Sequence, residues 1–222
     1  MPLKKHMPDI RFGGNKVDVD EINHKFRYHV LKPSVSASFI GTVNATGADD
    51  FVIDQTKCDY PRTLLLTITG VAGGMGGTAT ITGTDQFGVA QSETLGFGSA
   101  ANGGTIAGTK IFDTVSAATV DGLDGLGGTA VGTASIGFAI GTAANLVAKF
   151  GLPDRIGAVS DVKKIIWNDN GTIKGVNGGT VSSTYVDTAK HSFNIGEVVA
   201  AADDFYVEYI STYDGENDVN VA

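Results

Sequence analysis

Residues 77–97, GTATITGTDQFGVAQSETLGF, carry the clearest fold signal in the chain. Side chains in a strand alternate between two faces, so residues 77–84 are predicted to form a strand with one hydroxyl face and one aliphatic face. The hydroxyl face holds Thr78, Thr80, Thr82 and Thr84, and the aliphatic face holds Ala79, Ile81 and Gly83. The next four residues, Asp-Gln-Phe-Gly, suit a type I turn, which favours Asp at its first position and Gly at its last. A second strand is predicted over residues 89–97.

Strand signals of the same kind recur on both sides of this hairpin. Short β-branched or aliphatic runs bounded by Gly, Asn, Asp or Pro predict strands over residues 36–43, 51–54, 63–70, 105–113, 115–120, 129–141 and 204–211. We expect the run 105–113 to continue the meander that begins at residue 77. Helix is limited to short turns predicted over residues 18–26 and 143–150.

Two segments near the C-terminus predict which side chains face a core. In residues 162–176, Asn170-Gly171 separates two apolar runs, which is a strong hairpin signal. We expect Trp167 and Ile165 to share one face, with Ile173 packed nearby. In residues 204–211 the alternation places on one side Phe205, Val207 and Tyr209, and on the other Tyr206, Glu208 and Ile210.

The whole pattern predicts an all-β protein. About a dozen short strands with regularly spaced turns are typical of an antiparallel β-sandwich or barrel-like domain. Most of the 31 glycines fall between Gly70 and Gly141, among β-branched residues. Glycine inside a strand often marks a bulge or the close approach of another backbone, so this region is predicted to pack tightly against a neighbouring element or chain.

The chain divides into four segments on composition. Residues 1–33 hold Pro2, Pro8 and paired glycines with few apolar anchors, and are predicted to form an extended basic N-terminal arm. Residues 34–120 form a β domain or meander, and residues 121–128, DGLDGLGG, resemble a linker. Residues 129–222 form a second β portion, either separate or part of the same domain. The acidic end after residue 211 is predicted to be a surface tail.

Charge and cysteine content restrict the function classes. The net charge of −8 argues against nucleic acid as the main partner, because phosphate binding needs clustered Lys and Arg. The charge is uneven: residues 1–33 carry seven basic and four acidic side chains, net +3, and the rest of the chain carries net −11. Cys58 is the single cysteine, so no internal disulfide can form. With neither a signal-peptide pattern nor a long apolar span, we expect a protein made in the cytoplasm.

No motif in the sequence supports catalysis or a cofactor. The four histidines and Cys58 lack metal-ligand spacing. The glycine pattern at residues 74–79 precedes a strand, whereas a dinucleotide fingerprint follows a strand and opens a helix. Single Asp/Gly copies at residues 121–128 and 168–171 fall short of a calcium site. We therefore expect neither enzymatic activity nor a metal or cofactor.

The sequence resembles a family of virus-particle proteins. The similar residues are TATITGTDQFGVAQSETLGF, GTIAGTKIFDTVSAATV, IGFAIGTAANLVAKFGLPDRIGAVSDV, GTVSSTYVD and DFYVEYIS, which together cover roughly residues 63–211. This pattern is similar to virion structural proteins of tailed bacteriophages, in particular those that decorate the head. The resemblance implies a structural protein on the phage head surface, and no catalytic residues come with it.

The resemblance and the composition together suggest a role in assembly. We expect a decoration or cement protein that stabilises the capsid, with its arm on the major capsid protein or on a neighbouring copy in a homo-oligomer. The expected partner-binding residues are Lys4, Lys5, Arg11, Lys16, Lys25, Arg27 and Lys32. Two alternatives stay open: a low-copy collar, head–tail or fibre-attachment subunit, and a carbohydrate-binding adhesion module. The adhesion module would need exposed aromatic platforms, for which the candidates are Trp167, Tyr206 and Tyr209.

Overall fold

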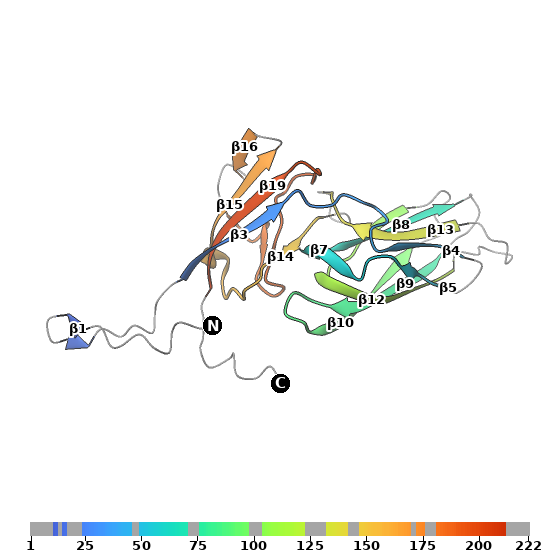
Figure 1. Cartoon of the computed structure of the whole chain (residues 1–222), viewed down its shortest axis with the longest axis horizontal. Coiled ribbons are helices and arrows are strands. Elements are labelled where there is room, and N and C mark those ends of the chain that lie inside the picture. The colour runs from blue at the N-terminus through green and yellow to red at the C-terminus, as the bar shows by residue number, and fades with distance from the viewer. Residues whose placement is uncertain are drawn as a thin grey trace.

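The fold is all-β and antiparallel, as expected. A computed structural model describes residues 11–12, 15–16, 24–45, 49–70, 76–97, 104–122, 132–141, 147–169, 172–175 and 181–211. These residues form three sheets and one two-stranded hairpin, together with a single turn of 3-10 helix at Val159–Asp161, and they contain no α-helix. The strands gather into two bodies that lie side by side along the long axis (Figure 1).

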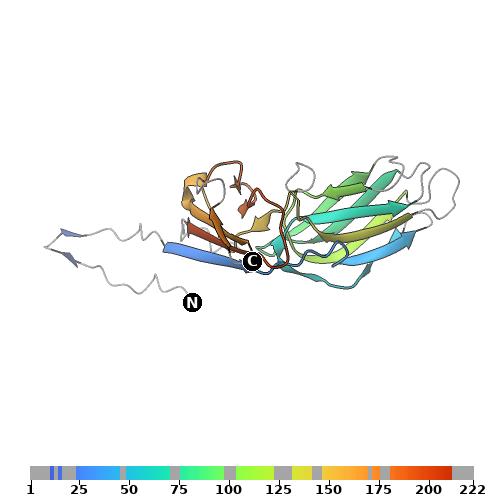
Figure 2. The same ribbon diagram turned by 90° about the horizontal axis from the view of Figure 1, so that it is seen from above.

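The first body is a β-sandwich. One of its sheets has the order β11-β8-β13-β4-β6 and the other contains the run β10-β9-β12-β7, with β5 pairing with β12. The strands of the first sheet are β4 (Gly41–Ala45), β6 (Val52–Ile53), β8 (Leu64–Gly70), β11 (Gly104–Ala107) and β13 (Gly132–Phe138). Those of the second are β5 (Asp49–Asp50), β7 (Lys57–Arg62), β9 (Gly77–Thr84), β10 (Ala90–Phe97) and β12 (Phe112–Asp121). Figure 2 shows the two layers from above.

The sandwich core is mostly aliphatic and is built from both sheets. Leu66 of β8 and Ile136 of β13 come from one layer, and Ile81 of β9 and Val115 of β12 from the other; all four side chains have no exposed surface. Removing apolar surface from water contributes roughly 25 cal/mol per Å². This burial therefore stabilises the packing of the two sheets against each other.

The second body is built from segments far apart in the sequence. Its four-stranded sheet has the order β16-β15-β19-β3. The strands are β3 (His24–Leu31), β15 (Val162–Asp169), β16 (Thr172–Gly175) and β19 (Asp204–Ser211). The sheet packs over a second core whose buried members include Val30, Phe150, Phe193, Phe205 and Val207.

The two bodies share one sheet. Beyond β7 the sandwich sheet continues through β14 (Phe150–Gly151), β18 (Ser192–Phe193) and β17 (Val186–Asp187), which belong to the second core. Phe150 of β14 lies opposite Arg62 of β7 and opposite Phe193 of β18. The backbone therefore connects the two cores without a break in the sheet.

The opening hairpin forms as predicted. β9 and β10 pair from Gly77↔Phe97 to Thr84↔Ala90. Ala79 and Ile81 are fully buried, whereas the threonines on the other face keep partial or full exposure. Gly88 N donates to Asp85 O over 3.1 Å, and the Asp85 carboxylate accepts from the Phe87 and Val89 amides. The alternation and the turn residues thus produce the local structure that they predict.

The arm predicted over residues 1–33 is too long. His24–Leu31 forms β3, which pairs with β19 along its whole length, and Val30 and Pro33 are buried. Alternating charged and apolar residues in this strand bury one face and expose the other, which a reading based on average composition misses. The helix predicted over residues 18–26 is wrong at its C-terminal end, since residues 24–26 are strand; residues 18–23 lie outside the described residues.

Three further predictions need correction. The run 105–113 does not continue the meander: β11 pairs with β8 in one sheet and β12 with β9 in the other, so the chain crosses the sandwich between them. Of the helical turn predicted over residues 143–150, residues 147–150 instead form a bridge and the start of β14, and residues 143–146 lie outside the described residues. Ile173 lies opposite Asn168, one register position away from Trp167, and is 76% exposed.

The segment 121–128 does not separate two domains. β12, which ends at Asp121, and β13, which begins at Gly132, both belong to the sandwich. Residues 123–131 lie outside the described residues. The chain passes between the two cores twice, between β3 and β4 and again after β13, and the sandwich takes residues from both predicted β portions.

Candidate interaction surfaces

The outward face of the four-stranded sheet is a ladder of cross-strand pairs. Arg27 of β3 lies opposite Glu208 of β19, and its Nη2 donates to Glu208 Oε1 over 2.5 Å. His29 lies opposite Tyr206, and the two rings stack with centroids 4.1 Å apart at 15°. Opposite-charge and aromatic pairs of this kind each contribute roughly 0.2–1 kcal/mol to a sheet. The face is therefore ordered by its own contacts while remaining accessible.

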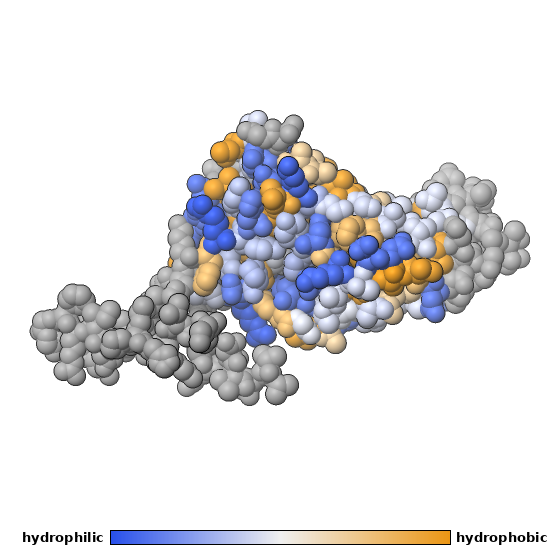
Figure 3. Space-filling view, in the orientation of Figure 1, coloured by the Kyte–Doolittle hydropathy of each residue, from blue (hydrophilic) through white to orange (hydrophobic). Residues whose placement is uncertain are grey.

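This face mixes charged and apolar groups. Leu31 is 48% exposed and Ile173 is 76% exposed, and Arg27 and Lys164 on the same face are also exposed. Figure 3 shows hydrophilic and hydrophobic residues interspersed over these strands. Mixed surfaces with a few exposed apolar groups resemble the rim and centre of ordinary protein–protein contacts. The face is therefore neither uniformly charged nor uniformly apolar.

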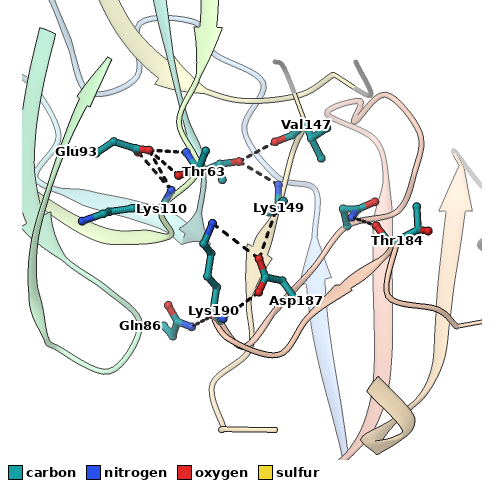
Figure 4. A network of polar contacts seen from close by, with 11 residues as sticks. Thr63, Gln86, Glu93, Lys110, Val147, Lys149, Thr184, Asp187 and Lys190 are labelled. Carbon is teal, nitrogen blue, oxygen red and sulfur yellow. Dashed lines mark hydrogen bonds and ion pairs between the residues drawn. The ribbon is translucent and has the colours of Figure 1, made fainter. Parts of the chain in front are cut away.

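A polar network lies where the two bodies meet (Figure 4). Asp187 of β17 is the centre of one part, with its Oδ2 3.5 Å from Lys149 Nζ and 3.9 Å from Lys190 Nζ. Gln86, from the turn of the opening hairpin, donates through Nε2 to Lys190 O over 2.9 Å. Thr63 donates to Val147 O and accepts from the Lys149 amide, both at 3.0 Å. Side chains of the sandwich thus bond to the backbone of the second body.

Two adjoining hollows border this network. They have volumes of about 390 Å³ and 260 Å³ and share Lys149, Thr184, Tyr185 and Asn194. Lys149 and Asp187, the charged pair at this point, neutralise each other. The remaining lining mixes glycine and small polar residues with apolar ones, and it adds one charged residue, Glu197.

Glu93 is a buried carboxylate with a structural explanation. Its Oε1 accepts from the Thr109 amide at 2.6 Å and from Thr109 Oγ1 at 3.0 Å, and the Lys110 amide is 3.4 Å from both oxygens. A Cβ at Gly108 would collide with the same carboxylate. Glu93 therefore holds the crossover between β11 and β12 through the amides of Thr109 and Lys110.

Arg62 joins the two cores. Its side chain is fully buried, and its guanidinium lies over two rings, Phe138 of the sandwich core at 4.2 Å and Phe150 of the second core at 4.8 Å. Nη1 donates to Ser34 O and pairs with Asp59 Oδ2 at 3.3 Å, while Nη2 donates to Ala139 O at 3.2 Å. Burial lowers the pKa of Arg62. A planar, persistently charged group with several donors is suited to such a position.

The remaining titratable groups favour a structural role. Burial raises the pKa of the Cys58 thiol to about 12, which keeps it protonated and unreactive at neutral pH. Burial lowers the pKa of His191, whose Nδ1 accepts from the Ile156 amide over 3.2 Å. Within the described ranges, no three His, Cys, Asp or Glu side chains lie close enough together to hold a metal ion.

The predicted partner-binding residues divide between two places. Arg11 of β1 (Arg11–Phe12) lies opposite Lys16 of β2 (Asn15–Lys16) in a short hairpin. Lys25 and Arg27 belong to β3, and Lys32 follows it with a φ of 47° and an amide that donates to Asp203 O. Lys4 and Lys5 lie outside the described residues. The seven residues therefore do not form one arm.

The aromatic candidates for sugar binding are mostly buried. Trp167 is 8% exposed and Tyr209 is 1% exposed, and the Tyr209 hydroxyl donates to Asp154 Oδ2. Tyr206 keeps one partly exposed face but stacks on His29. Core packing of Trp167 and Tyr209 agrees with the alternation of these strands, and a sugar platform at either residue is excluded by burial.

Sequence reasoning missed the junction residues. Arg62 ends β7, one residue before the apolar run of β8, and nothing in its neighbours in sequence distinguishes a buried arginine from an exposed one. Gln86 was noticed only as part of a turn. Their roles depend on contacts with residues 77 and 104 positions away in sequence, Ala139 and Lys190.

Comparisons with known proteins leave the family open. No protein-family model, no curated protein and no solved structure matches the chain. In the part of the chain that the structure describes, no helix is long and apolar enough to cross a membrane. The function is therefore argued from the surfaces themselves and from the resemblance in the sequence.

Proposed function

We propose that this protein is a structural component of a tailed-phage virion that binds the outside of the capsid shell as a decoration protein and stabilises the head. The observation that carries the proposal is the way the basic N-terminal segment joins the body. Residues 1–16 hold four basic side chains and one acidic side chain, and residues 17–23 hold three acidic side chains and no basic one. The chain then enters β3 at His24, an edge strand held by eight pairs to β19. A charged segment anchored in this way can order on a partner and contribute a large contact area.

The organisation of the body supports the same role. Its buried charged groups, Arg62 and Glu93, are used in internal contacts, and its hollows lack a catalytic set of side chains. The outward sheet face offers mixed charged and apolar surface to a protein partner. These features suit a protein that acts by binding to other subunits.

A binding experiment tests the proposed role of the N-terminal segment. Purified full-length protein is added to phage particles that lack it, and bound protein is measured after gradient sedimentation. Deletion of residues 2–23 should abolish binding while the body stays folded, since β3 begins at His24. A deletion that extended through residue 30 would remove the fully buried Val30 and confuse the two effects. Fluorescence of Trp167, the only tryptophan, reports whether the shortened protein is folded.

Full binding by the folded shortened protein would contradict the role of the segment. Absence of binding by the full-length protein would contradict the decoration role itself. The collar or fibre-attachment alternative predicts saturation at a few copies on each particle, so the stoichiometry of the same experiment separates it from a shell-wide role.

A further inference from the structure

The edge of β3 that faces away from β19 carries backbone groups that no described strand pairs with. Lys32 N donates to Asp203 O, toward β19, over 2.9 Å. Leu31 N and Leu31 O instead bond to the Tyr60 hydroxyl, each at 2.9 Å, and Tyr60 belongs to β7 in a different sheet. Backbone direction alternates along an antiparallel strand. The N–H and C=O groups of Lys25, Arg27 and His29 therefore point to the open edge.

The open edge has a defined length. Tyr60 occupies the polar groups of Leu31 and closes the edge at that end. Three positions of the same parity remain in the strand, residues 25, 27 and 29, and each carries a basic or imidazole side chain. The Arg27 side chain is 64% exposed, and only its Nη2 is bonded to Glu208 in the contact between β3 and β19. A guanidinium has five N–H donors, so Arg27 has capacity for a second carboxylate.

The same chain contains a segment with the complementary pattern. Residues 212–222, TYDGENDVNVA, follow β19 directly and have carboxylates at every second position, Asp214, Glu216 and Asp218, with no basic residue. In an extended conformation, side chains at every second position share a face. Antiparallel pairing would place Asp218, Glu216 and Asp214 opposite Lys25, Arg27 and His29 in that order.

We propose that the acidic C-terminal segment of a second copy, residues 212–222, adds as a strand to the open edge of β3 and links copies of this protein. Backbone bonds supply affinity and the alternating charges supply the register, as in other cases of strand addition. Pairing of β3 with the β3 of another copy is disfavoured, because a two-fold centred on Arg27 would place Arg27 opposite its equivalent. The contact is head-to-tail, so it builds rings, chains or reciprocal dimers. The proposal is independent of the particle and is tested on the protein alone.

The test uses two variants of the whole protein. One has a blocked β3 edge, and the other lacks the acidic C-terminal segment. Arg27→Pro removes an N–H that points to the open edge, so it blocks strand addition without removing a bond to β19. The second variant ends at Ser211 and lacks the acidic segment. Sedimentation velocity of the wild-type protein should show association that increases with concentration up to about 1 mM. Each variant alone should stay monomeric, whereas an equimolar mixture should form a one-to-one complex, since one supplies an open edge and the other the acidic strand.

Controls separate strand addition from loss of charge or of folding. Arg27→Ala keeps the edge N–H and should weaken association less than Arg27→Pro does. Trp167 fluorescence should be unchanged in every variant, because Trp167 lies in the buried core beside β19 and reports folding of this sheet. Replacing Asp214, Glu216 and Asp218 with their amides should weaken association in low salt and have less effect in high salt.

Three results would overturn the proposal. A wild-type protein that stays monomeric throughout this range has no such contact. If the protein without residues 212–222 still associates but Arg27→Pro does not, the edge of β3 binds a different segment. A mixture of the two variants that contains only monomers would show that the acidic segment does not bind in trans.

Discussion

The two bodies of this protein are stabilised in different ways. In the sandwich, strands such as β8, β9 and β12 have 7, 8 and 10 residues and pair in long ladders over an aliphatic core. The second body has one ladder of this kind, formed by β15, β19 and β3 with eight residues each. Its other strands, β14, β17 and β18, have two residues each, and core residues such as Leu152 and Ile195 lie outside any strand. Long ladders supply repeated backbone hydrogen bonds. Short strands supply few of them, so the turns between short strands need hydrogen bonds from side chains.

Single side chains hold the turns of the second body. Asp161 Oδ2 accepts from the Gly157 and Ala158 amides at 2.8 Å each, and Asp203 Oδ2 accepts from the Ala200 amide at 2.8 Å. His191 does the same for Ile156. When one contact is lost from a ladder, many other strand pairs remain. A turn held by one carboxylate loses its side-chain hydrogen bonds when that carboxylate is removed. We therefore expect point substitutions to destabilise the sandwich mainly through its strand packing, and the second body mainly through single polar contacts.

The largest expected effect comes from removing the residue that joins the two cores. Arg62→Ala removes the cation that pairs with Asp59 and opens a space between Phe138 and Phe150. We expect a loss of about 3 kcal/mol in the free energy of unfolding and separation of one unfolding transition into two. In urea, Trp167 fluorescence, which reports the second body, should change before far-ultraviolet circular dichroism does. Lys57→Ala, at an exposed position of the same strand, is the control. If Arg62→Ala unfolds in one transition at the same urea concentration as Lys57→Ala, Arg62 does not join the two cores.

A substitution inside the sandwich tests the close approach of its backbones. A Cβ at Gly83 would collide with Thr114 O of β12, beside the register shift between Val115 and Ala117. Gly83→Ala should therefore lower the free energy of unfolding by about 2 kcal/mol. Gly96→Ala on the adjacent strand meets no atom within 4 Å and should be neutral or slightly stabilising. Equal effects of the two substitutions in thermal unfolding would show that sheet packing does not require glycine at position 83.

A smaller effect is expected at a single polar contact of the second body. Tyr209 is 1% exposed, and its hydroxyl donates to Asp154 Oδ2 over 2.5 Å. Tyr209→Phe should cost about 1.5 kcal/mol, because a bond to a carboxylate is lost while the ring still fills its place. Tyr206→Phe is the matched control on the accessible face of the same strand. If both variants have the same midpoint in chemical denaturation, the bond between Tyr209 and Asp154 does not stabilise the fold.

The smallest expected effect depends on pH. Burial lowers the pKa of His191 from its ordinary value of 6.5, so the folded state favours the neutral ring. The resulting stability is present above pH 6.5 and is lost as the pH falls and His191 becomes protonated. His191→Asn, which tolerates the positive φ of 47° at this position, should reduce the fall in melting temperature between pH 7 and pH 5. An unchanged pH dependence would assign the acid sensitivity to other groups.

The sequence predicted the ladder regions well for a physical reason. In residues 77–97, 162–169 and 204–211, one face is buried and the other is not, so alternation of side chains is visible in the sequence itself. The fold class follows from such segments. β3 was missed because its inward positions, the half-buried Tyr28 and the buried Val30, lie among charged residues, and average composition hides a period of two.

The junction could not be predicted from the sequence. Arg62, Gln86 and Thr63 acquire their roles from partners that the fold brings close from 77 to 104 positions away. No local pattern encodes such contacts. The candidate partner-binding residues were selected on charge alone, and charge did not distinguish those in β3, which are part of a sheet, from those nearer the N-terminus.

The most direct test of the proposed function is the copy number of this chain in purified particles. Quantitative mass spectrometry of gradient-purified phage gives the ratio of this protein to the major capsid protein. A decoration protein should be present at a fixed ratio that corresponds to hundreds of copies spread over the shell. A ratio that corresponds to a dozen copies or fewer would place the protein at a vertex, neck or tail, and its absence from the particles would contradict a structural role in the virion.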